Sequence, residues 1–334
     1  AQAVIVNSGN ANACAPFGME NARRQAKAGA RALGVSEENV IVASTGVIGQ
    51  TLPVEAIEDH AGEMEMKYDN SLAAAEAIMT TDTKVKTIAV EFDIDGTTCH
   101  IGGICKGSGM IHPNMGTMLC FITTDCAVSS EMIRKALLFN VKRTFKRVTV
   151  DGDTSTNDMC TVLANGMAGN AEITAEGPAY EAFREALQAV MQDLARKIAA
   201  DGEGASKLMT CTVKGAKDEE TAEVLAKSIA GSSLTKAAMF GSDANWGRVL
   251  CAMGYSGAEF NTEKVLVEFA SKEGSIAVCE DGRGLDFDED LAKKILSQDE
   301  VEINVTLQEG SGSATCWGCD LTYDYVKING DYRT

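Results

Sequence analysis

The sequence has no long run of apolar residues, although 45% of its 334 residues are hydrophobic. A helix that crosses a membrane needs about 20 consecutive apolar residues, and a secretory signal needs a basic start followed by an apolar stretch. Neither pattern is present in the sequence. We therefore expect a cytoplasmic protein with no membrane partner and a sizeable core. A chain of this length also predicts two lobes.

Positive charge is scarce as well. The sequence has 48 acidic residues against 30 lysines and arginines, which gives a net charge of −18. Nucleic acids and anionic membrane surfaces would repel such a protein, so we expect neither as a partner. A small anionic substrate is not excluded, because a single local cation can still bind it.

Histidine is almost missing, with only His60, His100 and His112 in the chain. A Ser-His-Asp arrangement would have to pair His112 with Ser108, but the segment lacks the Gly-x-Ser-x-Gly turn that presents such a serine. The glycines after Lys106 do not form a phosphate-binding loop either, because no Gly-Lys-Ser/Thr follows them. Both kinds of site are therefore disfavoured.

The 11 cysteines are mostly isolated within apolar runs, where a free cysteine behaves as a small hydrophobic residue. Without a secretion signal, a reducing compartment is favoured over disulfides. Cys316 and Cys319 have the spacing of a zinc or redox pair. Because no second pair follows them and their run is strand-like, we expect a structural role.

The segment 106–125, KGSGMIHPNMGTMLCFITTD, organises the chain. A small, flexible Gly116 precedes Thr117, which begins a run typical of a buried strand. Gly116 allows the backbone to bend, so that the Thr117 hydroxyl could attack the preceding carbonyl. The break would give Thr117 a free α-amine of pKa about 8, able to act as its base. On these two residues alone, an ordinary glycine turn before a core strand is the favoured interpretation.

A wider pattern changes that balance. Segment 106–125 resembles the cleavage and active-site segment of the ornithine acetyltransferase (glutamate N-acetyltransferase) family, which usually has alanine at the position of Gly116. Five more blocks resemble that family in its own order: 7–13, 44–49, 77–83, 151–158 and 325–334. Family members also carry an upstream portion that we expect to be lacking before Ala1. The resemblance thus extends over essentially the whole chain.

The resemblance implies an α/β fold, a layered αββα-like sandwich with a second, smaller lobe. Alternation of predicted strands and helices along the chain independently favours α/β layers. The family also implies a break between Gly116 and Thr117, giving an N-terminal segment 1–116 and a C-terminal segment 117–334. The two segments would stay together as an α2β2 heterotetramer, and the second lobe would begin at about residue 250.

Several site residues follow from the resemblance. Thr117 would be the nucleophile, and Thr45 and Gly46 would form the oxyanion hole, where one donor is worth ~10²–10³ in rate. By its sequence context, Lys106 is a cation before glycines in an apolar setting, which favours carboxylate binding. By itself, Glu203 between two glycines would be a solvent-facing turn. The family's substrate-binding positions match Thr80, Lys106, Thr117, Glu203, Asn329 and Thr334.

The implied reaction is ping-pong transfer of acetyl from N2-acetylornithine to glutamate through acetyl-Thr117, in arginine biosynthesis. No cofactor is implied, although acetyl-CoA is an alternative acetyl donor in some members. The polar loop 151–158 follows a predicted strand, which suggests a functional loop near Thr117. Its three acidic residues could hold a metal, but the resemblance implies none. The alternatives are a self-processing amidase or aminopeptidase that uses water as acceptor, and an uncut, non-catalytic binding protein.

Periodicity and turn residues predict the individual elements. Helices are expected at 21–33, 53–68, 71–79, 131–142, 157–167, 178–200, 218–229, 245–255 and 286–296. Strands are expected at 3–6, 40–43, 86–94, 98–104, 117–123, 147–150, 206–214, 265–269, 275–279, 301–307 and 314–325.

Overall fold

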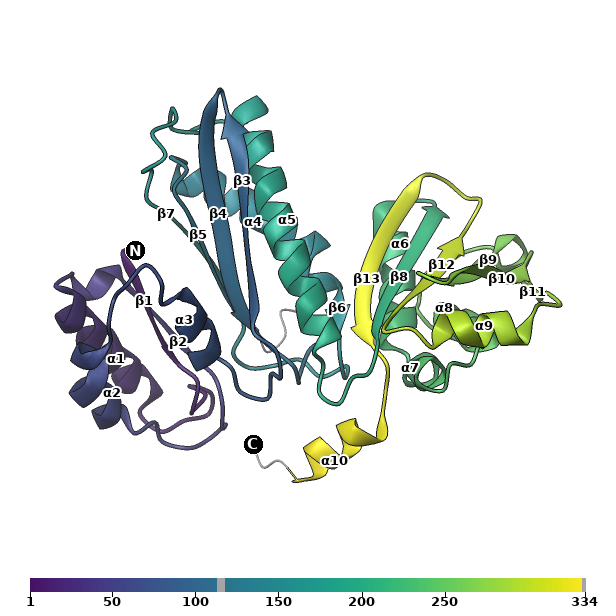
Figure 1. The fold of residues 1–334 in the computed structure, drawn as a ribbon, viewed down its shortest axis with the longest axis horizontal. Helices are drawn as coiled ribbons and strands as arrows, with labels where there is room; N and C mark the ends of the chain where they lie inside the picture. The colour runs from purple at the N-terminus through teal and green to yellow at the C-terminus, as the bar shows by residue number, and fades with distance from the viewer. Residues whose placement is uncertain (113–117, 332–334) are drawn as a thin grey trace.

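The computed structural model describes residues 1–112 and 118–331 and places three groups of elements side by side (Figure 1). A small N-terminal unit lies at one end, a sheet with two long helices lies in the middle, and a larger sheet lies at the other end. Helices and strands alternate through all three, which confirms the α/β class. Among the described residues, no helix has the length and apolar character required to cross a bilayer.

The N-terminal unit is built on two parallel strands, β1 (Ala3–Asn7) and β2 (Val40–Ser44). Between them runs α1 (Gly18–Leu33), which ends at Gly34, a residue in the left-handed conformation (φ 68°) that glycine adopts without strain. After β2 come α2 (Val54–His60), a 3₁₀ turn at Ala61–Glu63 and α3 (Ser71–Ala77).

The expected helix 53–68 is wrong in its second half. Helical structure stops at Glu63, and residues 62–69 are all exposed. A helix is stabilised mainly by burying one face, and this stretch has no face to bury. The Met-Glu-Met sequence at 64–66 therefore stays outside the helix although its residues are good helix formers.

The middle sheet has the order β3-β4-β5-β7. The hairpin of β3 (Lys86–Ile94) and β4 (Thr97–Lys106) turns at Asp95 and Gly96, both with positive φ, as a tight two-residue loop requires. Strand β5 (Leu119–Thr124) pairs antiparallel with β4, and β7 (Met159–Ala164) pairs parallel with β5.

The expected helix 157–167 is therefore wrong, because its central residues form β7. The run Cys-Thr-Val-Leu at 160–163 contains β-branched residues, and six residues of β7 pair in register with β5. The gain from this long-range pairing outweighs the weak local preference for helix.

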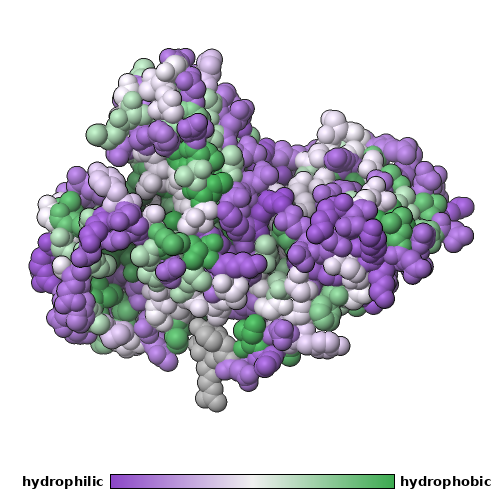
Figure 2. Space-filling model, in the orientation of Figure 1, coloured by the Kyte–Doolittle hydropathy of each residue, from purple (hydrophilic) through white to green (hydrophobic). Residues whose placement is uncertain are grey.

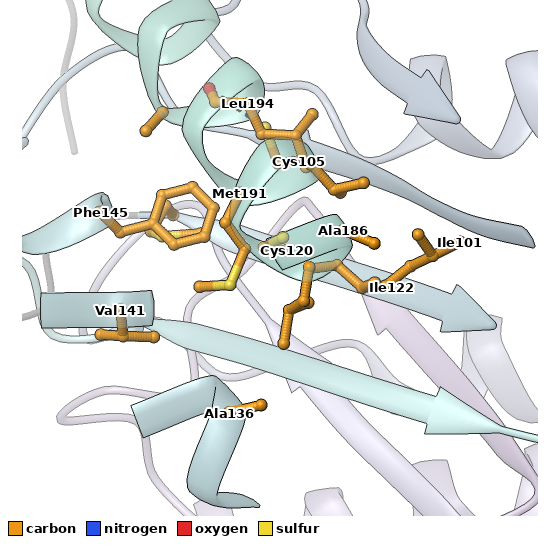
Figure 3. Packing of buried hydrophobic residues seen from close by; sticks show 14 of the residues in the cluster. Ile101, Cys105, Cys120, Ile122, Ala136, Val141, Phe145, Ala186, Met191 and Leu194 are labelled. Atoms are coloured by element: carbon orange, nitrogen blue, oxygen red, sulfur yellow. Dashed lines mark hydrogen bonds between the residues drawn. The ribbon is translucent and has the colours of Figure 1, made fainter. Parts of the chain in front are cut away.

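The core of this part lies between the sheet and α5 (Pro178–Ala200), which packs on β3 and β4 and also contacts α4 (Ser130–Arg143) (Figure 3). The bounds of α5 match the predicted 178–200. Its buried face repeats at helical spacing through Leu187, Met191 and Leu194, which pack with Cys105 and Ile122 of the sheet. Burying each large apolar side chain contributes about 1.5–3 kcal/mol, so this face fixes the helix.

The C-terminal sheet has the order β11-β10-β9-β12-β8-β13-β6. We expected the second lobe to begin at about residue 250. That boundary stays a prediction. The C-terminal sheet also includes β8, which begins at Leu208, and β6. The remaining elements are β6 (Val148–Thr149), β8 (Leu208–Ala216), α6 (Glu219–Gly231), α7 (Ser233–Phe240), α8 (Trp246–Gly254), β9 (Leu266–Ser271), β10 (Gly274–Glu280), β11 (Arg283–Gly284), α9 (Glu289–Leu296), β12 (Glu300–Thr306), β13 (Gly312–Cys319) and α10 (Tyr323–Asp331), with further 3₁₀ turns at Glu37–Asn39, Phe145–Arg147 and Thr262–Lys264.

The expected strand 314–325 is wrong beyond Cys319. Both oxygens of the Asp320 side chain accept hydrogen bonds, from Ser206 and from the backbone N–H of Lys207, and the chain turns away from the sheet there. Helix α10 follows (Figure 1). Cys316 and Cys319 are both buried on β13, and burial raises the pKa of each thiol.

Hydrophilic residues dominate the outer surfaces of the face drawn in Figure 2, as the large number of charged residues predicts. Apolar residues are visible between the N-terminal unit and the middle sheet (Figure 2).

Candidate active site

Lys106 is the last residue of β4, and its side chain is buried rather than solvated (3% exposed). Its Nζ lies 4.0 Å from Oδ2 of Asp82. Burial lowers the pKa of Lys106, whereas the negative charges of Asp82 and Glu203 act against that shift. The cation that the sequence singled out is thus held inside the protein among opposite charges.

The Asp82 carboxylate connects several of the predicted residues. Its Oδ1 accepts hydrogen bonds from Lys86 Nζ at 2.6 Å and from the backbone N–H of Gly107 at 2.7 Å. Its Oδ2 accepts the backbone N–H of Thr80 at 3.2 Å. Burial favours the neutral acid, but Lys86 and Lys106 together hold the pKa of Asp82 below its usual value. Thr80 and Lys106 are therefore brought together around one charged carboxylate.

Asp201, directly after α5, ties the same region to the end of that helix. Its Oδ2 lies 2.5 Å from Lys86 Nζ, and it accepts hydrogen bonds from Thr83 and from the N–H of Lys84. Its backbone carbonyl accepts a hydrogen bond from the hydroxyl of Ser108 at 2.6 Å. The loop after β4 is thereby fixed against the end of α5.

That contact places Glu203 against the loop after β4. The N–H of Glu203 donates to the carbonyl of Ser108 at 3.0 Å, and the glutamate side chain lies over Gly109. A Cβ added at Gly109 would lie 2.4 Å from the Glu203 carboxylate, so only glycine allows this approach. Glu203 is half-buried, not the solvent-facing turn residue that its glycine neighbours alone would predict.

Helix α10 brings Asn329 to the same carboxylate. The start of α10 packs on Gly204, whose carbonyl accepts a hydrogen bond from the Thr322 hydroxyl at 2.6 Å. Asn329, further along the helix, donates through Nδ2 to Oε2 of Glu203 at 2.9 Å. Among the predicted substrate-binding residues, the structure thus connects Thr80 with Lys106 and Glu203 with Asn329. Thr334 lies outside the described residues.

The loop 151–158 contacts the chain on both sides of residues 113–117. The Asp151 carboxylate accepts the N–H groups of Met110 at 2.7 Å and Ile111 at 3.0 Å. Oδ1 of Asp158 accepts the N–H of Met118 at 3.2 Å. Gly116 and Thr117, the predicted cleavage site and nucleophile, lie outside the described residues. The described part of the chain contains no group of three or more His, Cys, Asp or Glu that could hold a metal.

Asp158 has an altered proton affinity. Burial raises its pKa to about 7, against the hydrogen bond from the Met118 N–H, which favours the charged form. The carboxyl therefore keeps its proton to a higher pH than an ordinary aspartate does. Its hydrogen-bond partner, Met118, directly follows Thr117 in the sequence.

Thr45 and Gly46 follow β2 in a tightly packed turn. Thr45 is buried, and its N–H donates to the carbonyl of Asn7 at 2.9 Å. Gly46 has φ 121°, and a Cβ there would lie 2.3 Å from the carbonyl oxygen of Gly9. Only glycine fits both the conformation and the space.

A cavity of about 190 Å³ lies between this N-terminal unit and the middle sheet. Ser44, next to Thr45, lines it together with Leu119 at the start of β5 and with Asp158. The end of β2 therefore lies beside the start of β5. The predicted oxyanion residues, Thr45 and Gly46, directly follow β2. The other lining residues are Asn12, Ala22, Val42, Ala43, Asn157 and Met159.

Sequence reasoning missed Asp82, Lys86 and Asp201. Asp82 lies inside the block 77–83 that resembles the family, but a buried charge network has no sequence pattern of its own. A lysine opening the strand at 86 gave the only hint, because a charge at the first position of a buried strand needs a partner.

Comparison with known proteins supports the resemblance over the full length. The ArgJ family model matches residues 1–334. The arginine biosynthesis bifunctional protein ArgJ of Caldanaerobacter subterraneus subsp. tengcongensis is 49% identical over 100% of this chain and 84% of that protein. The ArgJ protein of Symbiobacterium thermophilum is 51% identical over 100% of this chain and 83% of its own length.

A solved structure agrees with the fold. The crystal structure of the arginine biosynthesis bifunctional protein ArgJ from Bacillus halodurans is 46% identical, with a TM-score of 0.60, and the match covers 64% of this chain and 98% of that one. With a family model that spans every residue and relatives near 50% identity, this chain belongs to the ArgJ family.

Proposed function

We propose that this protein is an acetyltransferase of arginine biosynthesis that moves the acetyl group of N2-acetylornithine to glutamate. The observation that carries the proposal is the joining of Lys106 and Thr80 through one buried carboxylate, with the half-buried Glu203 close enough to affect the charge of Lys106. A cation and an anion in one site suit an amino-acid substrate, whose carboxylate and amine carry the opposite charges.

The nucleophile in this proposal is Thr117, made available by a break of the chain. Its hydroxyl oxygen attacks the carbonyl carbon of Gly116, the C–N bond breaks as the nitrogen takes up a proton, and water hydrolyses the ester. Gly116 then ends one segment in a carboxylate, and Thr117 begins the next with a free α-amine beside its hydroxyl.

Acetyl transfer follows in two steps. The α-amine takes the hydroxyl proton while the Thr117 oxygen attacks the acetyl carbonyl, and the proton passes to the nitrogen of ornithine, which leaves. The amine of glutamate then attacks the acetyl ester, N-acetylglutamate leaves, and the proton returns to the hydroxyl. Thr45 and Gly46 stabilise the oxyanion in both steps. Lys106 binds the carboxylate of the amino acid, and Glu203, held by Asn329, binds the side-chain amine of ornithine.

The proposed break is also supported by the length of the part of this chain that matches the solved Bacillus halodurans chain. Residues 117–334 are 218 of the 334 residues, or 65% of the chain. The solved Bacillus halodurans chain is covered almost completely by 64% of this chain, as expected if it corresponds to one segment after the same break.

The first test is the mass of the purified protein. Wild type is expected to give two chains separated between Gly116 and Thr117, and Thr117→Ala a single uncut chain without activity. Thr117→Ser keeps the hydroxyl and is the matched control, expected to be cut and to retain some turnover. An uncut wild-type chain with full activity would refute the nucleophile.

The second test follows labelled acetyl from N2-acetylornithine. Label in N-acetylglutamate supports transfer, whereas label only in free acetate would make the protein a self-processing amidase, with water as acceptor. Replacing the donor by acetyl-CoA decides whether the enzyme also makes N-acetylglutamate that way. We propose that the reaction takes place in the cytoplasm without a cofactor, by an α2β2 assembly. Light scattering of the cut protein checks the assembly.

A further inference from the structure

Asp82 is the most enclosed charge in the site. Its side chain is 0% exposed, and its two oxygens serve different partners. Oδ1 binds Lys86 and the N–H of Gly107, directly after Lys106, while Oδ2 faces the N–H of Thr80 and the ammonium of Lys106. A single carboxylate therefore fixes the backbone on both sides of the site.

Two lysines compete for this carboxylate. Lys86 is nearer, at 2.6 Å, but it also has a second carboxylate, Asp201, at 2.5 Å. Lys106 lies 4.0 Å from Asp82. Besides Asp82, the charges that act most strongly on Lys106 are those of Lys86, which favours its neutral form, and of Glu203, which favours the cation. Burial raises the pKa of the neighbouring Cys105 thiol and keeps it uncharged. Asp82 is the strongest of those favouring the cation.

We propose that Asp82 is a positioning residue of the acetyl-transfer site, which keeps Lys106 charged and sets it against Thr80 for binding the substrate carboxylate. This inference rests on the proposed function and adds to it a residue that does not itself touch substrate. Lys86 belongs to the same network, because it binds both Asp82 and Asp201, and its own positive charge acts against that of Lys106.

Asp82→Asn tests the proposal. The amide can keep an acceptor toward Gly107 and Lys86, but it has no charge, and its NH₂ would face the donors of Thr80 and Lys106. Loss of an opposite charge at this distance lowers the pKa of a lysine by about 1 unit or more. The pH at which KM for N2-acetylornithine begins to rise should fall by about 1 unit, and KM at neutral pH should rise more than kcat falls.

Asp201→Asn is the matched control. Asp201 is also a buried carboxylate bound to Lys86, but the charges that act most strongly on Lys106 are those of Asp82, Lys86 and Glu203. Its loss should reduce stability as Asp82→Asn does. The alkaline limb of the KM profile, that is, the pH at which KM begins to rise, should stay where it is in wild type. A merely structural role of Asp82 would give the two variants the same profile.

Lys86→Gln gives a second, opposite test that remains if Asp82→Asn cannot be purified. It removes the competing cation, so the alkaline limb should move to higher pH. An unshifted limb in either variant, with wild type transferring acetyl normally, overturns the role of Asp82 and leaves the proposed function intact. Absence of acetyl transfer by wild type would instead refute the proposed function.

Discussion

Gly46→Ala is the substitution for which the structure gives the clearest expected loss. The new Cβ would lie 2.3 Å from the carbonyl oxygen of Gly9 and 2.5 Å from its carbon, and both are backbone atoms that cannot rotate away. Residue 46 must move by about 1 Å to reach ordinary contact. Its φ of 121° would also cost alanine about 1–3 kcal/mol.

Moving residue 46 should lower kcat, because Gly46 belongs to the proposed oxyanion hole. A misplacement of about 1 Å in a positioned group can cost about 10²-fold, and complete loss of one oxyanion donor costs ~10²–10³ in kcat. We therefore expect Gly46→Ala to lower kcat for acetyl transfer by about 10²-fold. KM should change less, because the oxyanion forms only in the transition state.

The control is Gly49→Ala in the same turn. Gly49 also has positive φ, 77°, but a Cβ there would have no neighbour within 4 Å. This variant should show the conformational cost, about 1 kcal/mol, without the displacement, and should keep most of its kcat. Initial rates of acetyl transfer measure the loss of kcat in both variants, and thermal melting measures their loss of stability. Equal losses of kcat in the two variants, or a Gly46→Ala enzyme with wild-type kcat, would refute the reasoning.

Two further predictions concern buried charges. The pKa of Asp158 is raised to about 7 from 3.8, so the folded state holds a proton that the unfolded state releases between these values, and stability contributed by this site falls as pH rises through that window. The melting temperature of Asp158→Asn minus that of wild type should therefore increase from pH 5 to pH 8, with the exposed Asp153→Asn as control, and a constant difference would contradict the assignment. Lys207→Met removes an ammonium that donates hydrogen bonds to the carbonyls of Met239 and Leu296 and to the hydroxyl of Ser242. The two buried carbonyls would then lack this donor. Unfolding in urea should show a loss of about 2–4 kcal/mol with KM unchanged, and a loss below about 1 kcal/mol would show that the burial cost of the charge cancels its hydrogen bonds.

The sequence alone determined the elements whose stability is local. The hairpin at Asp95 and Gly96 has a turn that only a few residue types adopt, and α5 combines a proline start with apolar residues at helical spacing. Both were predicted with their bounds nearly correct. The family, too, was evident from ordered blocks of sequence, and the comparisons confirmed it.

The tertiary structure decided the rest. Residues 159–164 form a strand because β5 offers them a pairing partner, and residues 320–331 leave the sheet because Asp320 is held by Ser206 and Lys207. The charge network around Asp82 joins residues up to 119 positions apart, from 82 to 201, and no local pattern records it. Local preferences are worth tenths of a kcal/mol per residue, whereas burying a charge or completing a sheet is worth several, so long-range contacts determine these parts of the protein.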